Sequence, residues 1–205
     1  AIATITSDAD VEALVGSSAS IAVSGAVLVD AHLYGLENKA YAEAIGVSGG
    51  VFTAGVMLAD ASVGGGVKAQ LNGDVLGSSS VTVQATGGNL ADADTLSAAM
   101  GAFGGAGTGA LAEVTAAADV EALVGDTAEL TSSGAVLVQA TGDNDAIVDS
   151  DAGSGGIAAI SGSTLAATVA GGVKAELNGD VNDAASVTVQ ADGDNVADAE
   201  ALAIA

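Results

Sequence analysis

The chain has 205 residues, and its 26 acidic residues against 3 lysines give a formal net charge of −23. Phosphate groups and anionic lipid headgroups are bound by Lys and Arg, and this chain has no Arg, so nucleic acid and anionic membranes are excluded as partners. Half of the residues are apolar but only 2% are aromatic, and Cys is absent, which excludes disulfides and predicts a narrow core of small side chains.

Strand-like alternation begins at the first residue. Residues 1–5 alternate as a strand does, and "VLVDA" at 27–31 repeats the pattern. In "VKAQLNGDV" at 67–75 the odd positions are apolar or small and the even positions are polar. This is the period of a β-strand with one buried and one solvent-exposed face. No run reaches the ~18 apolar residues of a membrane span, so we expect no membrane insertion.

Two later segments carry the alternation further. Every even position from 110 to 124 is Ala or Val, and nine alternate positions over 165–181 are apolar or small. A strand usually has about 3–10 residues, so these runs predict a chain that turns corners without losing its in/out phase. Gly171 and Gly179 are expected at the corners. A helix would place its apolar residues at i, i+3 and i+4, which this pattern does not do.

The alternating segments belong to an internal repeat. "VKAQLNGDV" at 67–75 returns at 173–181 as "VKAELNGDV", and "DVEALVG" at 10–16 returns at 119–125. Two series of valines align: Val11, Val67, Val120 and Val173, and then Val27, Val81, Val136 and Val187. The chain therefore holds nearly four units of about 53 residues, at 11–66, 67–119, 120–172 and 173–205. Alternate units are more alike than adjacent ones.

This repeat predicts an all-β fold, a parallel β-solenoid that forms one continuous domain over residues 1–205. Because a unit is long for one compact turn, we expect two or three coils per unit, hence roughly eight to eleven coils and a rod on the order of 40–50 Å long at ~4.8 Å per layer. Lys68 and Lys174 are expected to be exposed. The residues expected to be buried are Val67, Ala69, Leu71, Val173, Ala175 and Leu177.

The first unit carries three extra residues between Val27 and Asn38, in the stretch "VDAHLYGLENKAY". Four of the chain's rarer side chains lie in this stretch: His32, Tyr34, Lys39 and Tyr41. One interpretation is a projecting loop that contacts a partner. The other is a surface insertion without a role, since loops accept insertions at little cost. A single isolated His does not indicate catalysis.

Two acidic segments, "TGDNDAIVDSD" and "ADGDNVADAE", are predicted to be loops. Their oxygen-bearing side chains suit Ca²⁺, which takes six to eight oxygen ligands. The candidate ligands are Asp143, Asn144, Asp145, Asp149, Asp151, Asp192, Asp194 and Asp198. The alternative is a set of solvated acidic turns, because neither the calcium-solenoid nonapeptide nor the EF-hand pattern is present. No other cofactor is expected. Calcium is expected to raise the melting temperature more than sodium at equal ionic strength.

An asparagine recurs once in every unit, at Asn38, Asn89, Asn144 and Asn195. If the units stack in register, these side chains can form an amide ladder between repeats. Two further asparagines precede glycine in "LNGD", at Asn72 and Asn178, and Asn-Gly is a strong turn signal. Both features predict structure and not chemistry.

The repeat pattern of "SVTVQATGGNLADADTLSAAMGAFGG" and "GVKAELNGDV" resembles that of the long repeat regions of bacterial secreted filamentous adhesins, especially the leukotoxin-like filamentous adhesins and related giant surface proteins. The resemblance covers the whole chain and lies in repeat style and composition. It implies a β-solenoid fibre exported to the bacterial cell surface, with a structural or adhesive role and a receptor or glycan on the cell surface as a partner.

We therefore expect a non-enzymatic structural segment of an extracellular filament or adhesin stalk, which other copies or adjoining repeats cover end to end. The alternative is a β-solenoid that binds ice or a glycan surface. Thr82 and Thr188 fall in matching columns for such an array, but Leu28 and Leu137 interrupt it. The least favoured alternative is a polysaccharide-active β-helix enzyme, because a sugar-binding cleft needs aromatic and charged side chains that the chain lacks.

Overall fold

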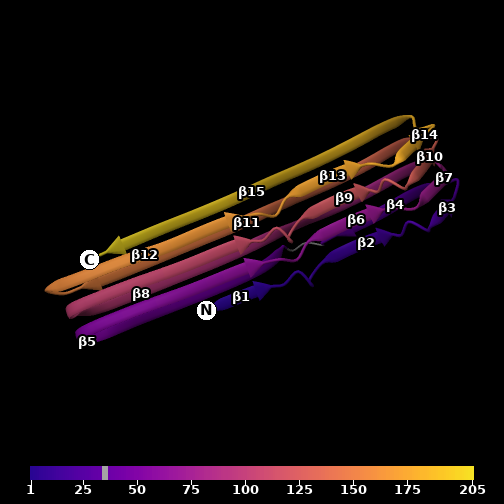
Figure 1. Cartoon of the computed structure of the whole chain (residues 1–205). Helices are drawn as coiled ribbons and strands as arrows, with labels where there is room; N and C mark the ends of the chain where they lie inside the picture. Colours follow the sequence, from indigo (N-terminus) through magenta and orange to yellow (C-terminus); the bar gives the residue numbers. More distant parts are fainter. Residues whose placement is uncertain (34–36) are drawn as a thin grey trace.

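The computed structural model describes residues 1–33 and 37–205. In these two ranges the chain is all-β, its strands pair in parallel, and no helix occurs (Figure 1). This confirms the predicted class, a parallel β-solenoid. Over the same ranges there is accordingly no helix long and apolar enough to cross a membrane.

The strands form three parallel sheets. The long sheet contains β1 (Ile2–Ile5), β4 (Ala26–His32), β5 (Asn38–Val63), β8 (Ser80–Val114), β11 (Ala135–Gly155), β12 (Ala158–Val169) and β15 (Ser186–Ile204). A second sheet contains β2 (Val11–Val15), β6 (Val67–Leu71), β9 (Val120–Val124) and β13 (Val173–Leu177). The third contains β3 (Ser20–Ala22), β7 (Asp74–Ser78), β10 (Glu129–Ser132) and β14 (Asp180–Asn182).

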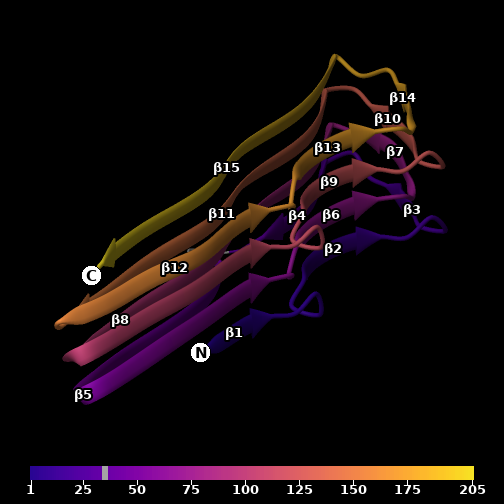
Figure 2. The ribbon, with the colours of Figure 1, turned by 60° about the vertical axis from the view of Figure 1, so that its left-hand side comes forward.

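Each sequence unit makes one coil and not two or three, so the expected rod of eight to eleven coils is wrong. Val136 pairs with Val81 of the preceding unit and with Val187 of the following one. A coil runs out along the long sheet, reverses near residues 100–103, returns, and closes through the two short sheets (Figure 2). Nearly four layers at ~4.8 Å give a stack on the order of 20 Å high. The coil is long and flat because its small side chains let the two layers approach closely.

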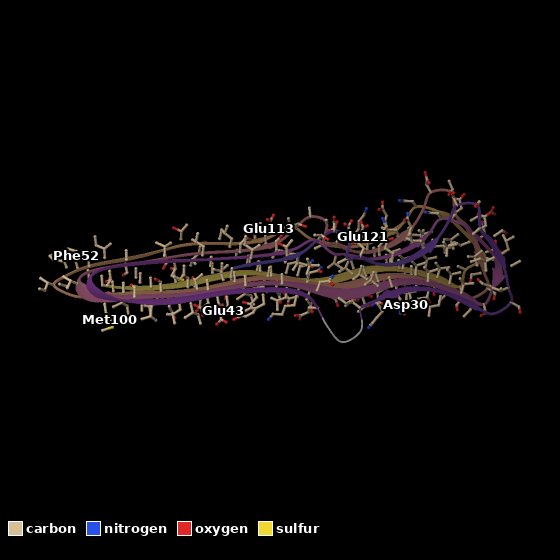
Figure 3. All side chains as sticks on the ribbon, turned by 90° about the horizontal axis from the view of Figure 1, so that it is seen from below. Asp30, Glu43, Phe52, Met100, Glu113 and Glu121 are labelled. Atoms are coloured by element: carbon tan, nitrogen blue, oxygen red, sulfur yellow. The ribbon has the colours of Figure 1, made fainter. Side chains whose placement is uncertain are left out.

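The core tapers along each coil. At the end that the short sheets close, it consists mainly of Val and Leu, such as Val81, Leu71 and Leu130, with some Ala. Toward the reversal it changes to mainly Ala, and at the reversal it is reduced to Ala99, Ala106 and Ala152. Seen along the stack, the body is accordingly wide at one end and thin at the other, which we call the tip (Figure 3). Side-chain volume therefore sets the distance between the two layers.

Hydroxyl groups complete the thin part of the core. Thr95 Oγ1 donates to Ser150 Oγ at 2.9 Å, and Ser150 Oγ donates to Thr108 Oγ1 across the core at 2.6 Å. Ser97 Oγ donates to the carbonyl of Gly55 in the opposite layer at 3.2 Å. A side chain of one layer thus reaches the backbone of the other. Buried hydroxyls are tolerated here because most of them find a partner.

The predicted corners are confirmed. The alternating run at 165–181 passes from β12 through residues 170–172 into β13, and then through 178–179 into β14. Gly171 and Gly179 lie in these two corners. Val67, Ala69 and Leu71 are buried as predicted. Their equivalents Val173, Ala175 and Leu177 are only partly buried, because β13 lies at the end of the stack. Lys174 is exposed, whereas Lys68 is partly covered.

The predicted amide ladder is confirmed for Asn38, Asn89 and Asn144, whereas Asn195 Nδ2 donates to the Gly171 carbonyl and makes no ladder bond. Asn38 Nδ2 donates to Asn89 Oδ1 at 3.0 Å, and Asn89 Nδ2 donates to Asn144 Oδ1 at 2.7 Å. Asn89 Nδ2 also donates to the carbonyl of Ala118 in the opposite corner. The ladder therefore joins successive coils and ties the two layers of a coil together. Asn89 and Asn144 are buried, where an unpaired amide is costly.

Two kinds of coil alternate, which explains why alternate units are more alike. One kind has long corners, and we call it bulged. Its corners lie at 6–10 and 16–19, and again at 115–119 and 125–128. The tight coils turn the same corners in two fewer residues, at 64–66 and 72–73, and again at 170–172 and 178–179. Tight corners are rich in Gly, because a Cβ on Gly73 would lie 2.5 Å from the Ala19 carbonyl oxygen of the neighbouring bulged corner. Bulged and tight coils are therefore complementary neighbours.

Charge alternates with coil type in one column of the second sheet. Glu12 pairs in register with Lys68, Lys68 with Glu121, and Glu121 with Lys174. The Lys68 and Glu121 side chains form an ion pair at 3.4 Å. Directly opposite like charges on neighbouring strands destabilise a sheet, so the alternation avoids this repulsion. The segment "VKAxLNGDV" therefore recurs at twice the unit length. Its Lys must alternate with Glu, and its tight corner must alternate with a bulged one.

The amide ladder gives the first testable prediction. Replacing Asn89 with Ala removes two ladder bonds and leaves the Ala118 carbonyl and Asn38 amide with one partner fewer. We expect the free energy of unfolding to fall by about 1–3 kcal/mol, measured by urea denaturation. Asn195→Ala is the matched control, because Asn195 lies on the exposed last strand, and a change within about 0.5 kcal/mol is expected. Equal losses in both variants would contradict the role of the ladder.

Candidate functional site

Acidic side chains gather on one outer face of the long sheet. The register places Glu43, Asp94, Asp149 and Glu200 in a single column across β5, β8, β11 and β15. The columns beside it add further carboxylates, so we call this surface the acidic face. Glu43 projects from it, whereas Glu113 and Glu121 project from the opposite side of the body (Figure 3). Because strands in register stand ~4.8 Å apart, like charges are held close together and attract cations.

The predicted calcium ligands lie on strands and not in loops. Asp143, Asp145, Asp149 and Asp151 belong to β11, and Asp192, Asp194 and Asp198 belong to β15. A small open hollow of about 200 Å³ lies between Glu43, Asp94, Asp149 and Asp151. Within residues 1–33 and 37–205, no group of three or more His, Asp or Glu side chains is arranged to hold a metal ion. The calcium site stays a prediction, with carboxylates of neighbouring coils as its ligands.

Asn144 is different from the other candidate ligands. Its side chain is buried in the core, and its Oδ1 accepts the hydrogen bond from Asn89. The alternation of the strand places it on the face opposite to Asp143 and Asp145. Its amide is therefore part of the ladder and does not face the solvent with the neighbouring carboxylates.

Asp145 shows the electrostatic cost of the acidic face. Partial burial raises the pKa of its carboxyl group, and a hydrogen bond from the backbone of Val196 opposes this by lowering it. The charges of Asp143, Glu37 and Asp194 raise the pKa further. Since the folded chain holds this proton more tightly than the unfolded chain does, this group's contribution to stability decreases as pH rises through its pKa.

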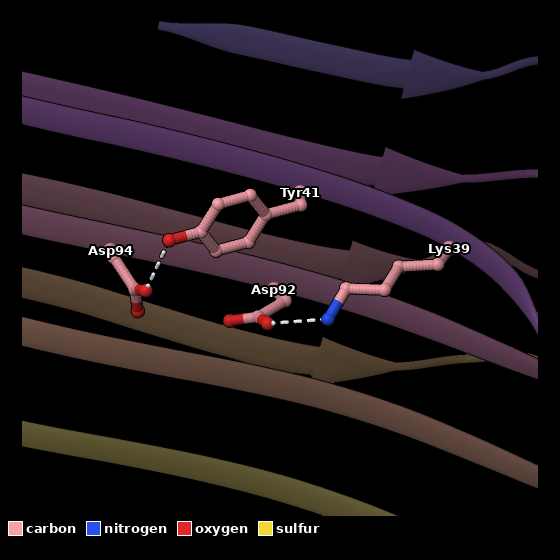
Figure 4. A network of polar contacts seen from close by, with 4 residues as sticks. All are labelled: Lys39, Tyr41, Asp92 and Asp94. Atoms are coloured by element: carbon pink, nitrogen blue, oxygen red, sulfur yellow. Dashed lines mark hydrogen bonds and ion pairs between the residues drawn. The ribbon is translucent and has the colours of Figure 1, made fainter.

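Lys39 and Tyr41 form a polar network with the next coil. Lys39 Nζ donates to Asp92 Oδ2 at 3.0 Å, and Tyr41 OH donates to Asp94 Oδ2 at 2.9 Å (Figure 4). Lys39 Nζ also lies 5.3 Å from the centroid of the Tyr41 ring. The hydrogen bond to Asp94 is the main reason that the pKa of Tyr41 rises to about 12. Two of the chain's rare side chains thus fasten the first coil to two carboxylates of the second.

The predicted partner loop is only partly within the described structure. Tyr34 lies outside the described residues. His32 is the last residue of β4, and Lys39 and Tyr41 lie within β5 and not on a projecting loop. The contacts of Lys39 and Tyr41 within the chain are with Asp92 and Asp94, which lie a full unit further along the sequence. A partner role for His32, Tyr34, Lys39 and Tyr41 stays a prediction.

The sequence reasoning missed an apolar surface at the tip. Phe52 and Phe103 stack there with ring centroids 5.0 Å apart and an interplanar angle of 7°. Ile157 and Ile160 complete a shallow open groove of about 730 Å³ beside them, and Phe52 remains 77% exposed. The groove offers apolar contact area and no titratable side chain. The sequence did carry an indication of this surface, because the only two Phe of the chain lie one repeat unit apart.

The second prediction concerns the Tyr41 phenol. In a Tyr34→Phe background, Tyr41 is the only tyrosine, and its phenolate absorbance is expected to titrate near pH 12. Asp94→Asn removes both the acceptor carboxylate and its charge, so the pKa of Tyr41 should fall toward its ordinary value of about 10. Circular dichroism at each pH verifies that the fold persists. An unchanged titration in the Asp94 variant would contradict the network.

The third prediction tests calcium. Millimolar CaCl₂ is expected to raise the melting temperature more than NaCl at equal ionic strength, because one divalent ion can bridge carboxylates of adjacent coils. The double variant Asp149→Asn with Asp151→Asn should lose part of this excess. Glu113→Gln is the matched control, because it removes one charge from the opposite face. Equal effects of the two salts would leave only general screening.

Comparison with known proteins gives no relative: no family model, no curated protein and no solved structure matches the chain. Function must therefore be argued from the chain's own geometry. That geometry consists of in-register columns along the stack, an acidic face, an apolar tip, and two ends whose strands have no partner on one side.

Proposed function

We propose that the chain is a non-enzymatic structural segment of an extracellular bacterial filament or adhesin stalk, extended end to end by further coils. The observation that carries this proposal is the state of the two ends of the stack. At the upper end, β15 is exposed along its whole length of 19 residues. At the lower end, β2 and β4 likewise have no strand beneath them among residues 1–33 and 37–205. An open strand edge is a template for another strand.

The core is open at the upper end as well. Val187 is 50% exposed and Val189 is 46% exposed, although their equivalents Val81 and Val83 are completely buried. A further coil would cover these side chains at about 25 cal/mol for each Å² of apolar surface removed from water. The same coil would satisfy the free backbone groups of β15. Both contributions favour growth along the stack.

Charge favours the same direction of growth. The acidic face lies on the side of the stack, and the chain as a whole has a net charge of −23, which repels neighbouring rods. The end strands alternate apolar and polar residues, and β15 also carries Asp192, Asp194, Asp198 and Glu200. Repulsion at the sides and burial at the ends together favour a thin rod over a lateral aggregate. The resemblance of the repeat to secreted filamentous adhesins supports the extracellular, cell-surface location.

The alternative of an ice-binding or glycan-binding surface has less support. The register confirms that Thr82 and Thr188 share a column, and also that Leu28 and Leu137 interrupt it. A flat threonine array is therefore broken at every second coil. The tip groove could accept an apolar partner, but Thr53 is its only polar side chain, and a sugar site needs several convergent polar groups.

The fourth prediction follows from the open ends. The purified 205-residue chain is expected to form linear particles whose length increases with concentration, measured by sedimentation velocity and negative-stain microscopy. Higher salt screens the repulsion at the sides and should allow rods to associate laterally as well. A strictly monomeric particle at all accessible concentrations would overturn the proposal of end-to-end growth.

A further inference from the structure

We propose that the two ends of the stack are complementary halves of one interface, and that a second copy of this chain binds head to tail with its bulged first coil on the tight last coil. This inference rests on the proposed end-to-end growth and adds to it a direction, a register and the residues that enforce them. We call β13, β14 and β15 the upper end, and β2, β3 and β4 the lower end.

The first argument is the strict alternation of coil types within the chain. From the lower end upward, the coils of β2, β6, β9 and β13 are bulged, tight, bulged and tight. Every internal junction therefore joins a tight coil to a bulged one. The stack begins with a bulged coil and finishes with a tight coil, so a head-to-tail contact repeats an internal junction. A head-to-head contact would instead place two bulged corners, or two tight corners, against each other.

The second argument is the space around two end glycines. Internally, a Cβ on Gly66 would lie 2.8 Å from the Asp119 carbonyl oxygen of the bulged coil above, so Gly is required. Gly172 is the equivalent residue of the last coil, and its nearest atom for such a Cβ is Asp119 Oδ1, at an ordinary 3.6 Å. Nothing within the chain requires Gly at 172. A bulged coil stacked above it would require Gly there, as the bulged coil above Gly66 does.

The lower end shows the same feature in the opposite direction. A Cβ on Gly125 would collide with Asn72 of the tight coil beneath it. Its equivalent in the first coil, Gly16, has no atom within 4 Å of such a Cβ. In a head-to-tail pair, Asn178 of the lower copy occupies the position beneath Gly16 that Asn72 occupies beneath Gly125. Both ends thus keep a glycine at a position where, inside the chain, a coil of the opposite type supplies the close contact.

The third argument is charge. Lys68, in the internal tight coil, reaches up to Glu121 of the bulged coil above it. Lys174 occupies the same column in the last coil, has no coil above it within the chain, and pairs with Glu176 of its own strand. Glu12 is the residue of that column in the first coil. Head-to-tail stacking places Glu12 of one copy over Lys174 of the other and continues the alternation of charge.

The same register continues the core and the asparagine column. It places Val11 over Val173, Val27 over Val187 and Asn38 over Asn195, as the internal columns do. It also places Lys39 and Tyr41 of one copy over Val196 and Asp198 of the other. The valines left half-exposed at the upper end then become buried.

The test uses one variant that blocks each end. Gly172→Val fills the space above the last coil, and Gly16→Val fills the space below the first coil. A Cβ at position 16 has no atom within 4 Å, and one at position 172 has its nearest atom at 3.6 Å, so both monomers should fold, verified by circular dichroism and melting temperature. Each variant alone is expected to stay monomeric at concentrations where the unmodified chain forms long particles. The expected loss in end-to-end affinity is at least about tenfold.

A mixture of the two variants distinguishes direction. The upper end of the Gly16 variant and the lower end of the Gly172 variant are intact, so an equimolar mixture is expected to form 1:1 dimers and nothing longer, measured by sedimentation velocity. Dimers formed by either variant alone would demonstrate head-to-head contact and overturn the inference. Long particles from either variant alone would demonstrate another register and overturn it as well.

Two controls keep the test interpretable. Gly66→Ala affects an internal junction and should lower the melting temperature of the monomer, whereas Gly172→Ala should leave it unchanged and still weaken assembly. Gly172→Ala also replaces the Val variant if that variant does not fold. If the unmodified chain itself stays monomeric, the proposed end-to-end function fails. If it assembles and the glycine variants assemble equally well, only the complementary interface is wrong.

Discussion

Backbone hydrogen bonds hold neighbouring coils in strict register. This register places every residue directly over its equivalent in the next coil, at ~4.8 Å, so any side chain is repeated as a column. An amide at such a position can bond to its own copies, as Asn38, Asn89 and Asn144 do. A carboxylate repels its copies, so the carboxylate column of Glu43, Asp94, Asp149 and Glu200 is found on an outer, solvated face.

The narrowness of the core has a second set of consequences. Two sheets can face each other over a long distance only if small side chains separate them, which explains a composition dominated by Ala, Val and Gly. Near the tip the separation is short enough for Ser97 to bond to the backbone of Gly55. Large apolar side chains do not fit between the two layers near the tip and lie on the surface, where the Phe52 and Phe103 rings stack on each other. An exposed apolar surface of this kind commonly marks a contact site.

Alternation of two coil types resolves a conflict that a uniform repeat would face. Identical corners would stack bulge on bulge and like charge on like charge. A bulged corner over a glycine corner, and Glu over Lys, satisfy both packing and charge.

The strand period, the aligned columns, the corner positions and the ladder of Asn38, Asn89 and Asn144 could be predicted from the sequence, because each of these repeats along the chain and repetition is visible without a structure. The number of coils per unit was decided only by the tertiary structure. A Gly in an alternating run looks the same whether the chain turns there or continues, and pairing with neighbouring coils selects the reversal near residues 100–103. The partners of Lys39 and Tyr41 were hidden for the same reason, since Asp92 and Asp94 become neighbours only when one complete coil has closed.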